Sequence, residues 1–92
     1  MRVELTRQAQ KDLRKVPGFI ADRFYRWIVD VNELGIQSVR KIPGWHDEPL
    51  KGDRKCQRSI RLNRSYRAIY RIDKEKRSVE LVEVLEINKH KY

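Results

Sequence analysis

The side chains most often used in catalysis are few in this chain of 92 residues. It has two histidines, His46 and His90, and one cysteine, Cys56. Neither histidine belongs to an HExxH or CxxC pattern, and the three residues together make a poor metal-binding set. No glycine-rich phosphate loop is present, and Ser59 lacks the surroundings of a Ser-His-Asp triad. These patterns argue against metal-dependent, nucleotide triphosphate and serine hydrolase chemistry.

The remaining polar side chains suit the cleavage of RNA. That reaction needs a base that takes the proton of a 2′-hydroxyl and an acid that protonates the leaving 5′-oxygen. It also needs cations that neutralise the charge of the crowded phosphorane. Carboxylate, imidazole and guanidinium groups are all present in the chain. The chemistry requires no metal ion, so we expect no cofactor.

The positive charge of the chain is concentrated in its middle. The chain carries 22 Lys and Arg against 13 Asp and Glu, a formal net charge of +9. Residues 36–77 hold thirteen basic and five acidic side chains, which is a net charge of +8 in that segment alone. A localised basic block indicates a polyanion as partner, because phosphates attract nearby charge. The alternative is that these side chains merely solubilise a small surface.

Length and composition limit the class of protein. The chain is expected to form a single domain over residues 1–92, since most domains span about 50–200 residues. No apolar run approaches the roughly 18 residues of a membrane span, and residues 1–4 do not begin a signal peptide. One cysteine cannot form an internal disulfide and fits a reducing compartment. We therefore expect a small basic cytoplasmic domain that does not enter a membrane.

The pattern of apolar residues predicts an α+β fold. A short strand over residues 3–5 precedes a helix over 7–15, for which Thr6 offers an N-cap. A second helix over 20–34 completes a helical hairpin, and Gly35 stands where a helix ends. Residues 36–55 are irregular. Three strands are expected to follow, over residues 57–63, 66–73 and 78–87.

Alternation within the predicted strands places arginines together. If Ile60 and Leu62 face the helices, Arg61 faces the other way, and the next strand turns Arg67 and Arg71 to that same side. Each arginine alone is most simply a solvated strand residue. A row of like charges on one sheet face is destabilising, however, and suggests an anionic ligand.

The chain contains four short motifs, over residues 48–52, 58–62, 66–72 and 90–92. Together they resemble the RelE/ParE superfamily of toxins from type II toxin–antitoxin systems. Within the superfamily the pattern is most similar to the RelE/YoeB-like mRNA interferases, over essentially the whole chain. The resemblance implies a RelE-like microbial RNase fold. In that fold an N-terminal strand and a helical hairpin pack on one face of a mainly antiparallel, curved four-stranded sheet.

The resemblance also implies roles for individual residues. Glu48 matches the general base, Arg67 the arginine that contacts the scissile phosphate, and His90 a C-terminal general acid. Tyr92 matches a terminal tyrosine that stacks on a base or assists proton transfer. His46 is a secondary candidate, for which packing in its loop is the alternative. A further group consists of basic side chains expected to contact phosphate or ribosomal RNA: Lys51, Arg54, Lys55, Arg58 and Arg61.

Function and partners follow from the same resemblance. It implies a toxin that cleaves mRNA in the ribosomal A site and so inhibits translation, with a cognate antitoxin, mRNA and the ribosome as partners. Two alternatives stay open. ParE-like members are described as inhibitors of DNA gyrase without nuclease activity, and the chain could also be a basic RNA-binding domain without catalytic activity.

Overall fold

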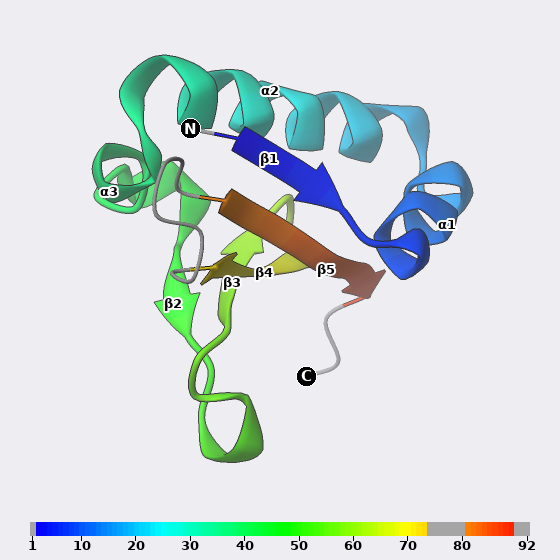
Figure 1. Cartoon of the computed structure of the whole chain (residues 1–92). Helices are drawn as coiled ribbons and strands as arrows, with labels where there is room; N and C mark the ends of the chain where they lie inside the picture. The colour runs from blue at the N-terminus through cyan, green and yellow to red at the C-terminus, as the bar shows by residue number, and fades with distance from the viewer. Residues whose placement is uncertain (1, 74–80, 90–92) are drawn as a thin grey trace.

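The computed structural model describes residues 2–73 and 81–89 (Figure 1). Its helices are α1 (Arg7–Lys15), α2 (Gly18–Leu34) and α3 (Ile36–Val39), with two 3₁₀ turns, η1 (Pro43–Trp45) and η2 (Gly52–Arg54). Its strands are β1 (Arg2–Leu5), β2 (Glu48–Pro49), β3 (Arg58–Arg61), β4 (Tyr66–Asp73) and β5 (Leu81–Lys89). The predicted α+β class is confirmed. None of these helices is long and apolar enough to cross a membrane.

The strands form one sheet in the order β1-β5-β4-β3-β2. β1 pairs with β5 in parallel, and the other three pairs are antiparallel, so the predicted mainly antiparallel sheet is confirmed. Four of the strands correspond to the predicted ones. The fifth, β2, is only two residues long and pairs Glu48 with Ser59 and Pro49 with Arg58 at one edge. A segment of two residues is too short to show the alternation of polar and apolar side chains that indicates a strand, so β2 was not predicted from the sequence.

Local signals explain where the long helices begin and end. The hydroxyl of Thr6 accepts a hydrogen bond from the backbone N–H of Ala9 at 3.1 Å, so the predicted N-cap of α1 is confirmed. α2 ends at Gly35, which has φ +81° and donates its N–H to Val31 O at 2.9 Å. α2 begins at Gly18, two residues earlier than predicted, because the carbonyl of Pro17 accepts the first bonds of the helix.

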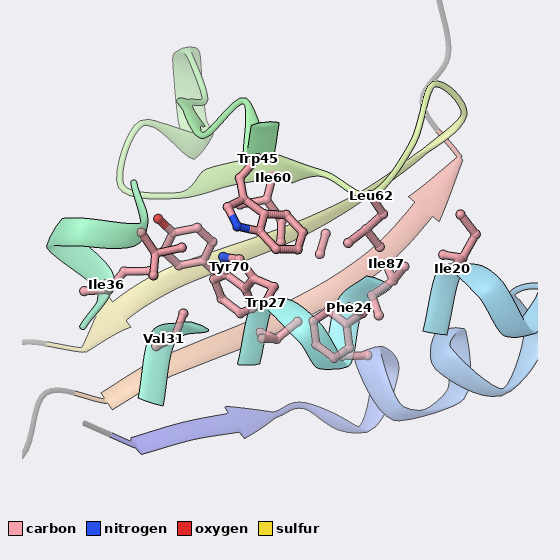
Figure 2. Packing of buried hydrophobic residues seen from close by; sticks show 14 residues of the cluster. Ile20, Phe24, Trp27, Val31, Ile36, Trp45, Ile60, Leu62, Tyr70 and Ile87 are labelled. Carbon is pink, nitrogen blue, oxygen red and sulfur yellow. The ribbon is translucent and has the colours of Figure 1, made fainter. Parts of the chain in front are cut away.

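The core lies between α2 and one face of the sheet (Figure 2). Ile20, Phe24, Trp27 and Val31 are completely buried along one side of α2. The sheet contributes to this core from three strands and one turn: Ile60, Leu62, Ala68, Tyr70, Val84 and Ile87. We refer to the opposite face of the sheet, which α2 does not cover, as the open face. Burial of Ile60 and Leu62 with exposure of Arg61 confirms the predicted alternation.

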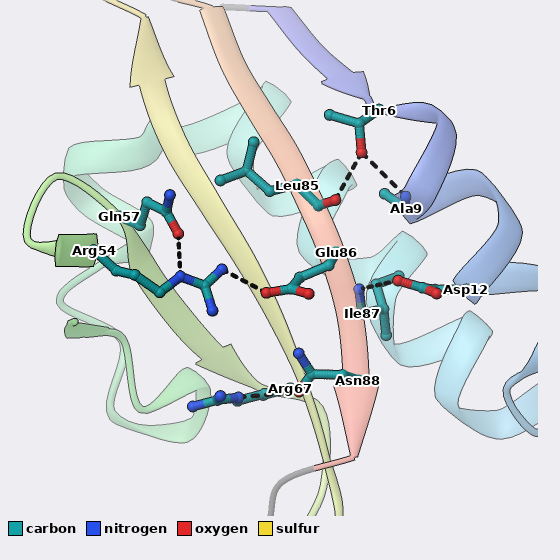
Figure 3. A network of polar contacts seen from close by, with 10 residues as sticks. All are labelled: Thr6, Ala9, Asp12, Arg54, Gln57, Arg67, Leu85, Glu86, Ile87 and Asn88. Carbon is teal, nitrogen blue, oxygen red and sulfur yellow. Dashed lines mark hydrogen bonds and ion pairs between the residues drawn. The ribbon is translucent and has the colours of Figure 1, made fainter. Parts of the chain in front are cut away.

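Helix α1 replaces a missing neighbour of β5. β1 pairs only with residues 81–84, so the second half of β5 has no strand on that side. There the Thr6 hydroxyl donates to Leu85 O at 2.7 Å, and an Asp12 carboxylate oxygen accepts from the Ile87 N–H at 3.0 Å (Figure 3). Both bonds satisfy backbone groups that a strand would otherwise pair. α1 therefore holds the part of β5 that leads to residue 89.

An irregularity in β5 decides which of its side chains reach the open face. Tyr70 pairs with Val84 but its neighbour Ile69 pairs with Glu86, which leaves Leu85 without a partner in β4. This β-bulge lets Val84 and Ile87 both point into the core, although an unbroken strand would turn them to opposite faces. β5 also runs two residues beyond the predicted end at residue 87, and the predicted start at 78–80 lies outside the described residues.

Candidate active site

A pocket of about 140 Å³ lies beside the start of β2, the end of β3 and the start of β4. Four residues that the sequence had singled out line it, namely His46, Glu48, Arg61 and Arg67. They come from the η1–β2 connection and three strands, so the sheet brings together side chains as far as 21 positions apart in the chain. The rest of the lining consists of Leu50, Ser59, Ile60, Asn63, Arg64 and Tyr66.

Strand register sets the geometry of this pocket. Glu48 pairs with Ser59, so the two side chains lie on the same face of the sheet. Arg61 pairs with Arg67, which in turn pairs with Asn88, in the next row along the same face. Rows two residues apart along a strand are separated by about 7 Å. The carboxylate row and the arginine row are therefore close enough to act on one nucleotide.

The two arginines are directly opposed across β3 and β4. Like charges in such a pair destabilise a sheet unless an anion lies between them. Arg61 is exposed, and the Nε of Arg67 donates to the amide oxygen of Asn88 at 3.1 Å (Figure 3). A neutral amide orients a guanidinium without cancelling its charge. The pair therefore places two guanidinium groups side by side on the open face, the kind of arrangement that attracts an anion.

Arg54 and Arg58, by contrast, are compensated by carboxylates. Arg54 Nη2 lies 2.5 Å from Glu86 Oε1, and its Nε donates to Gln57 at 2.7 Å (Figure 3). Arg58 Nε lies 2.5 Å from an Asp47 carboxylate oxygen. Neither arginine lines the pocket. Both arginines therefore link separate segments: Arg54 ties the η2 turn to β5, and Arg58 ties β3 to the residue before β2.

Asp47 holds the start of β2 in place, a role that the sequence alone did not assign to it. Its carboxylate is fully buried, and besides Arg58 it accepts a hydrogen bond from the Tyr70 hydroxyl at 2.5 Å. Burial of the phenol, and then the bond to Asp47, raise the pKa of Tyr70 far above its ordinary value. The residue after Asp47 is Glu48, so this network anchors the segment that carries the carboxylate. A signal was present: Arg58 shares its strand face with Ile60, and an arginine facing the core needs a partner.

His46 is placed by a second set of contacts. The guanidinium of Arg23 lies 3.9 Å above the Trp45 ring, and the Trp45 indole N–H donates to Asp30 at 3.2 Å. Both contacts fasten η1 to α2. His46 then adopts a left-handed conformation, with φ +46° and ψ +47°, which is uncommon for a residue other than glycine. The turn brings His46 into the pocket lining and redirects the chain into β2.

The other predicted site residues lie around this pocket or beyond the described chain. Lys51 and Lys55 are exposed on either side of η2. His90 and Tyr92 lie outside the described residues. The last described residue, Lys89, pairs with Tyr66, which lines the pocket. Among residues 2–73 and 81–89, no cluster of His, Cys, Asp or Glu is arranged to hold a metal ion.

A family model decides the identity of the chain. The model of the ParE toxin of type II toxin–antitoxin systems, parDE, matches residues 3–91. The chain belongs to this toxin family. The resemblance to the RelE/ParE superfamily is therefore confirmed, and the protein is a toxin of a type II toxin–antitoxin system.

Solved structures of similar proteins agree with this assignment. The toxin is 26% identical to the YoeB/ParE toxin from Agrobacterium tumefaciens, with a TM-score of 0.61 over 99% of this chain and 100% of that one. It is 27% identical to a chain of the RelBE2 toxin–antitoxin complex from Mycobacterium tuberculosis, with a TM-score of 0.60 over 97% and 96%. A YafQ mutant from E. coli has a TM-score of 0.73 over 98% and 94% at 15% identity, and supports the fold alone. The curated proteins contain no match to the toxin.

The buried tyrosine predicts that the toxin loses stability in alkali. The folded toxin keeps the Tyr70 phenol protonated, because its pKa is raised, whereas the unfolded chain ionises it at about 10. The stability that this group supplies is complete below that pH and is lost as the pH rises further. In Tyr70→Phe the free energy of unfolding should fall less steeply above pH 10, by up to about 1.4 kcal/mol per pH unit. Urea unfolding at a series of pH values measures this, and equal slopes for the two proteins would contradict it.

Proposed function

We propose that this toxin is an endoribonuclease that cleaves mRNA in the ribosomal A site. The observation that supports it best is the pocket itself, where the Glu48 carboxylate and the Arg61–Arg67 pair lie in adjacent rows of one sheet face. Within the described residues neither arginine forms an ion pair, and a base beside two such cations suits the attack of a 2′-hydroxyl on its own phosphate. Arg54 and Arg58 are less suited to this role, because each is already bound to a carboxylate.

In the proposed reaction Glu48 takes the proton of the 2′-hydroxyl. The freed oxygen attacks the adjacent phosphorus in line, so a 2′-oxygen–phosphorus bond forms as the bond to the 5′-oxygen breaks. Arg67, with Arg61 beside it, neutralises the charge that develops on the phosphorane. His90 gives a proton to the departing 5′-oxygen, and Tyr92 stacks on a base or assists that transfer. The products are a 2′,3′-cyclic phosphate end and a 5′-hydroxyl end.

The basic surface around the pocket suits a large RNA partner. Lys51 and Lys55 are exposed on the η2 loop, in the segment that carries most of the net charge. Cations beyond the cleavage site add affinity for phosphates without adding sequence preference. We propose that these lysines contact ribosomal RNA and so hold the toxin over the message.

A protein partner is also part of the proposal. The RelBE2 structure is that of a toxin–antitoxin complex, and the DinJ–YafQ structure is likewise a complex, with 98% of this chain covered at 15% identity. We propose that this toxin is inhibited by a cognate antitoxin whose acidic segment binds the basic surface.

One observation favours a second function. The family model that matches residues 3–91 is that of ParE toxins, and ParE-like members are described as inhibitors of DNA gyrase. This alternative predicts that the toxin blocks supercoiling and leaves mRNA intact. A basic RNA-binding domain without activity, the third possibility, predicts neither effect.

One pair of assays separates these functions. Purified toxin is added to translating ribosomes, where the 5′ ends of the message are mapped, and to a gyrase supercoiling reaction. We expect new 5′ ends within codons at the A site and unchanged supercoiling. Intact mRNA together with blocked supercoiling would contradict the endoribonuclease proposal and support inhibition of gyrase. Salt-sensitive RNA binding without either effect would leave a binding domain.

A further inference from the structure

The arginines beside the pocket differ in the kind of side chain that holds them. On the open face of β5, Glu86 and Asn88 stand two residues apart (Figure 3). The Glu86 carboxylate binds Arg54 at 2.5 Å, whereas the Asn88 amide oxygen accepts from Arg67 Nε at 3.1 Å. One arginine is thus neutralised by a carboxylate, and the other is held by a neutral group.

The neutral partner has a consequence for the phosphate site. A guanidinium has five N–H donors, and the bond to Asn88 uses only the one on Nε. Among residues 2–73 and 81–89 the two terminal nitrogens of Arg67 have no partner, so their donors remain for a ligand and the guanidinium keeps its positive charge. A carboxylate in place of this amide would form an ion pair with the guanidinium and compete with any phosphate. Asn88 can therefore orient the Arg67 side chain without neutralising its positive charge.

The carboxylate of Glu86 is a potential competitor for Arg67. Arg67 pairs directly with Asn88, so Glu86 is its diagonal neighbour, about 7–8 Å away between Cα atoms and within reach of long side chains. Glu86 is instead bound by Arg54, whose Nε is fixed by Gln57 at 2.7 Å. The Arg54 side chain is 41% exposed and that of Glu86 28%, so this ion pair lies at the protein surface rather than in the core.

We propose that Asn88 and Arg54 are positioning residues of the phosphate site. Asn88 orients the Arg67 guanidinium through a neutral oxygen, and Arg54 occupies the Glu86 carboxylate so that it does not neutralise Arg67. This inference rests on the proposed function, in which Arg67 binds the scissile phosphate. It changes the expected role of Arg54 from an RNA contact to a residue that acts through Glu86.

The first test replaces the amide by a carboxylate of the same shape. Asn88→Asp should lower the single-turnover rate of mRNA cleavage on ribosomes by about 10- to 100-fold, somewhat less than the loss of a whole charge-stabilising donor. The slope of log affinity for single-stranded RNA against log salt should fall by about 0.7, the value of one phosphate contact. Asn32→Asp makes the same change in charge on the exposed side of α2, outside the pocket lining, and should alter neither quantity.

The second test is a cycle of Arg54 and Glu86 variants. Arg54→Ala should lower the cleavage rate about 10-fold by releasing Glu86 toward Arg67. Adding Glu86→Gln to that variant should restore the rate to within about 2-fold of Glu86→Gln alone. An Arg54 that itself contacts RNA would give no such recovery, because removing Glu86 would not replace the lost contact. Thermal melting of each protein shows that it is folded.

The outcomes separate this inference from the function on which it rests. If wild-type toxin does not cleave mRNA, the proposed function is wrong. If the wild type cleaves, but folded Asn88→Asp cleaves equally fast or Glu86→Gln fails to rescue Arg54→Ala, the positioning role is overturned. Reduced cleavage by Asn88→Asp together with rescue in the cycle supports it.

Discussion

Glu48→Gln is expected to lower the single-turnover rate of mRNA cleavage by about 10²- to 10⁴-fold, the range that a positioned general base contributes. The amide has the shape of the carboxylate but cannot accept the 2′-hydroxyl proton. Glu48 is exposed in β2 and lines the pocket, so the substitution leaves the core untouched. The melting temperature should therefore stay close to that of the wild type, which separates a chemical loss from an unfolded protein.

Asp53→Asn provides the matched control for this experiment. Asp53 is an exposed carboxylate in η2, five residues from Glu48, and does not line the pocket. Both substitutions remove one negative charge, so a change in overall affinity for RNA should appear in both. The large loss should appear with Glu48→Gln alone. Cleavage by Glu48→Gln at the wild-type rate would mean that another group accepts the proton.

The second large effect concerns stability. Asp47→Ala is expected to reduce the free energy of unfolding by about 3–5 kcal/mol, as the loss of one partner from a buried ion pair does. The Arg58 guanidinium would then lie partly buried without its carboxylate, and the Tyr70 hydroxyl would lose its acceptor. That is a large part of the 5–15 kcal/mol by which a domain is usually stable. Urea unfolding at neutral pH measures the change.

Two further variants show whether the ion pair is the reason. Asp47→Asn keeps an acceptor oxygen for Tyr70 and should lose less stability than Asp47→Ala. Asp47→Leu combined with Arg58→Met removes both charges, and should recover part of the stability that Asp47→Ala loses. A cost of Asp47→Ala below about 0.5 kcal/mol, the range of surface substitutions, would contradict a structural role for the buried carboxylate.

Much of the fold could be predicted because its signals are local. Thr6 caps α1 and Gly35 ends α2 through bonds within a few residues, and such signals are visible in the sequence. The alternation around Ile60 and Arg61 was correct because β3 is a regular strand. The same alternation placed Arg61 and Arg67 on one face of the sheet. In the structure the register of β3 and β4 makes these two residues a direct pair.

The features that escaped prediction depend on contacts between distant segments. The bulge at Leu85 is set by how β4 and β5 pair, and it decides that Glu86 and Asn88 reach the open face. β2 exists only through its two pairs with β3. The ion pair of Arg58 with Asp47 joins residues eleven positions apart, which become neighbours only when β2 folds onto β3.

The same distinction separates the predicted site residues from each other. The family resemblance and the charge of the segment placed five basic side chains in one group of expected RNA contacts. Their neighbours in the fold divide the arginines into Arg61, which lines the pocket, and Arg54 and Arg58, which bind carboxylates. Composition could not show this division, because the acidic partners come from other elements.

The end groups of the cleaved message test the proposed reaction most directly. Ribosomes translating a defined mRNA are incubated with the toxin, and the 3′ end of the upstream fragment is analysed. Attack by the 2′-hydroxyl predicts a 2′,3′-cyclic phosphate there, and no cleavage when the nucleotide before the scissile phosphate is 2′-deoxy. An intact message, a 3′-hydroxyl end, or undiminished cleavage at the deoxy nucleotide would contradict it.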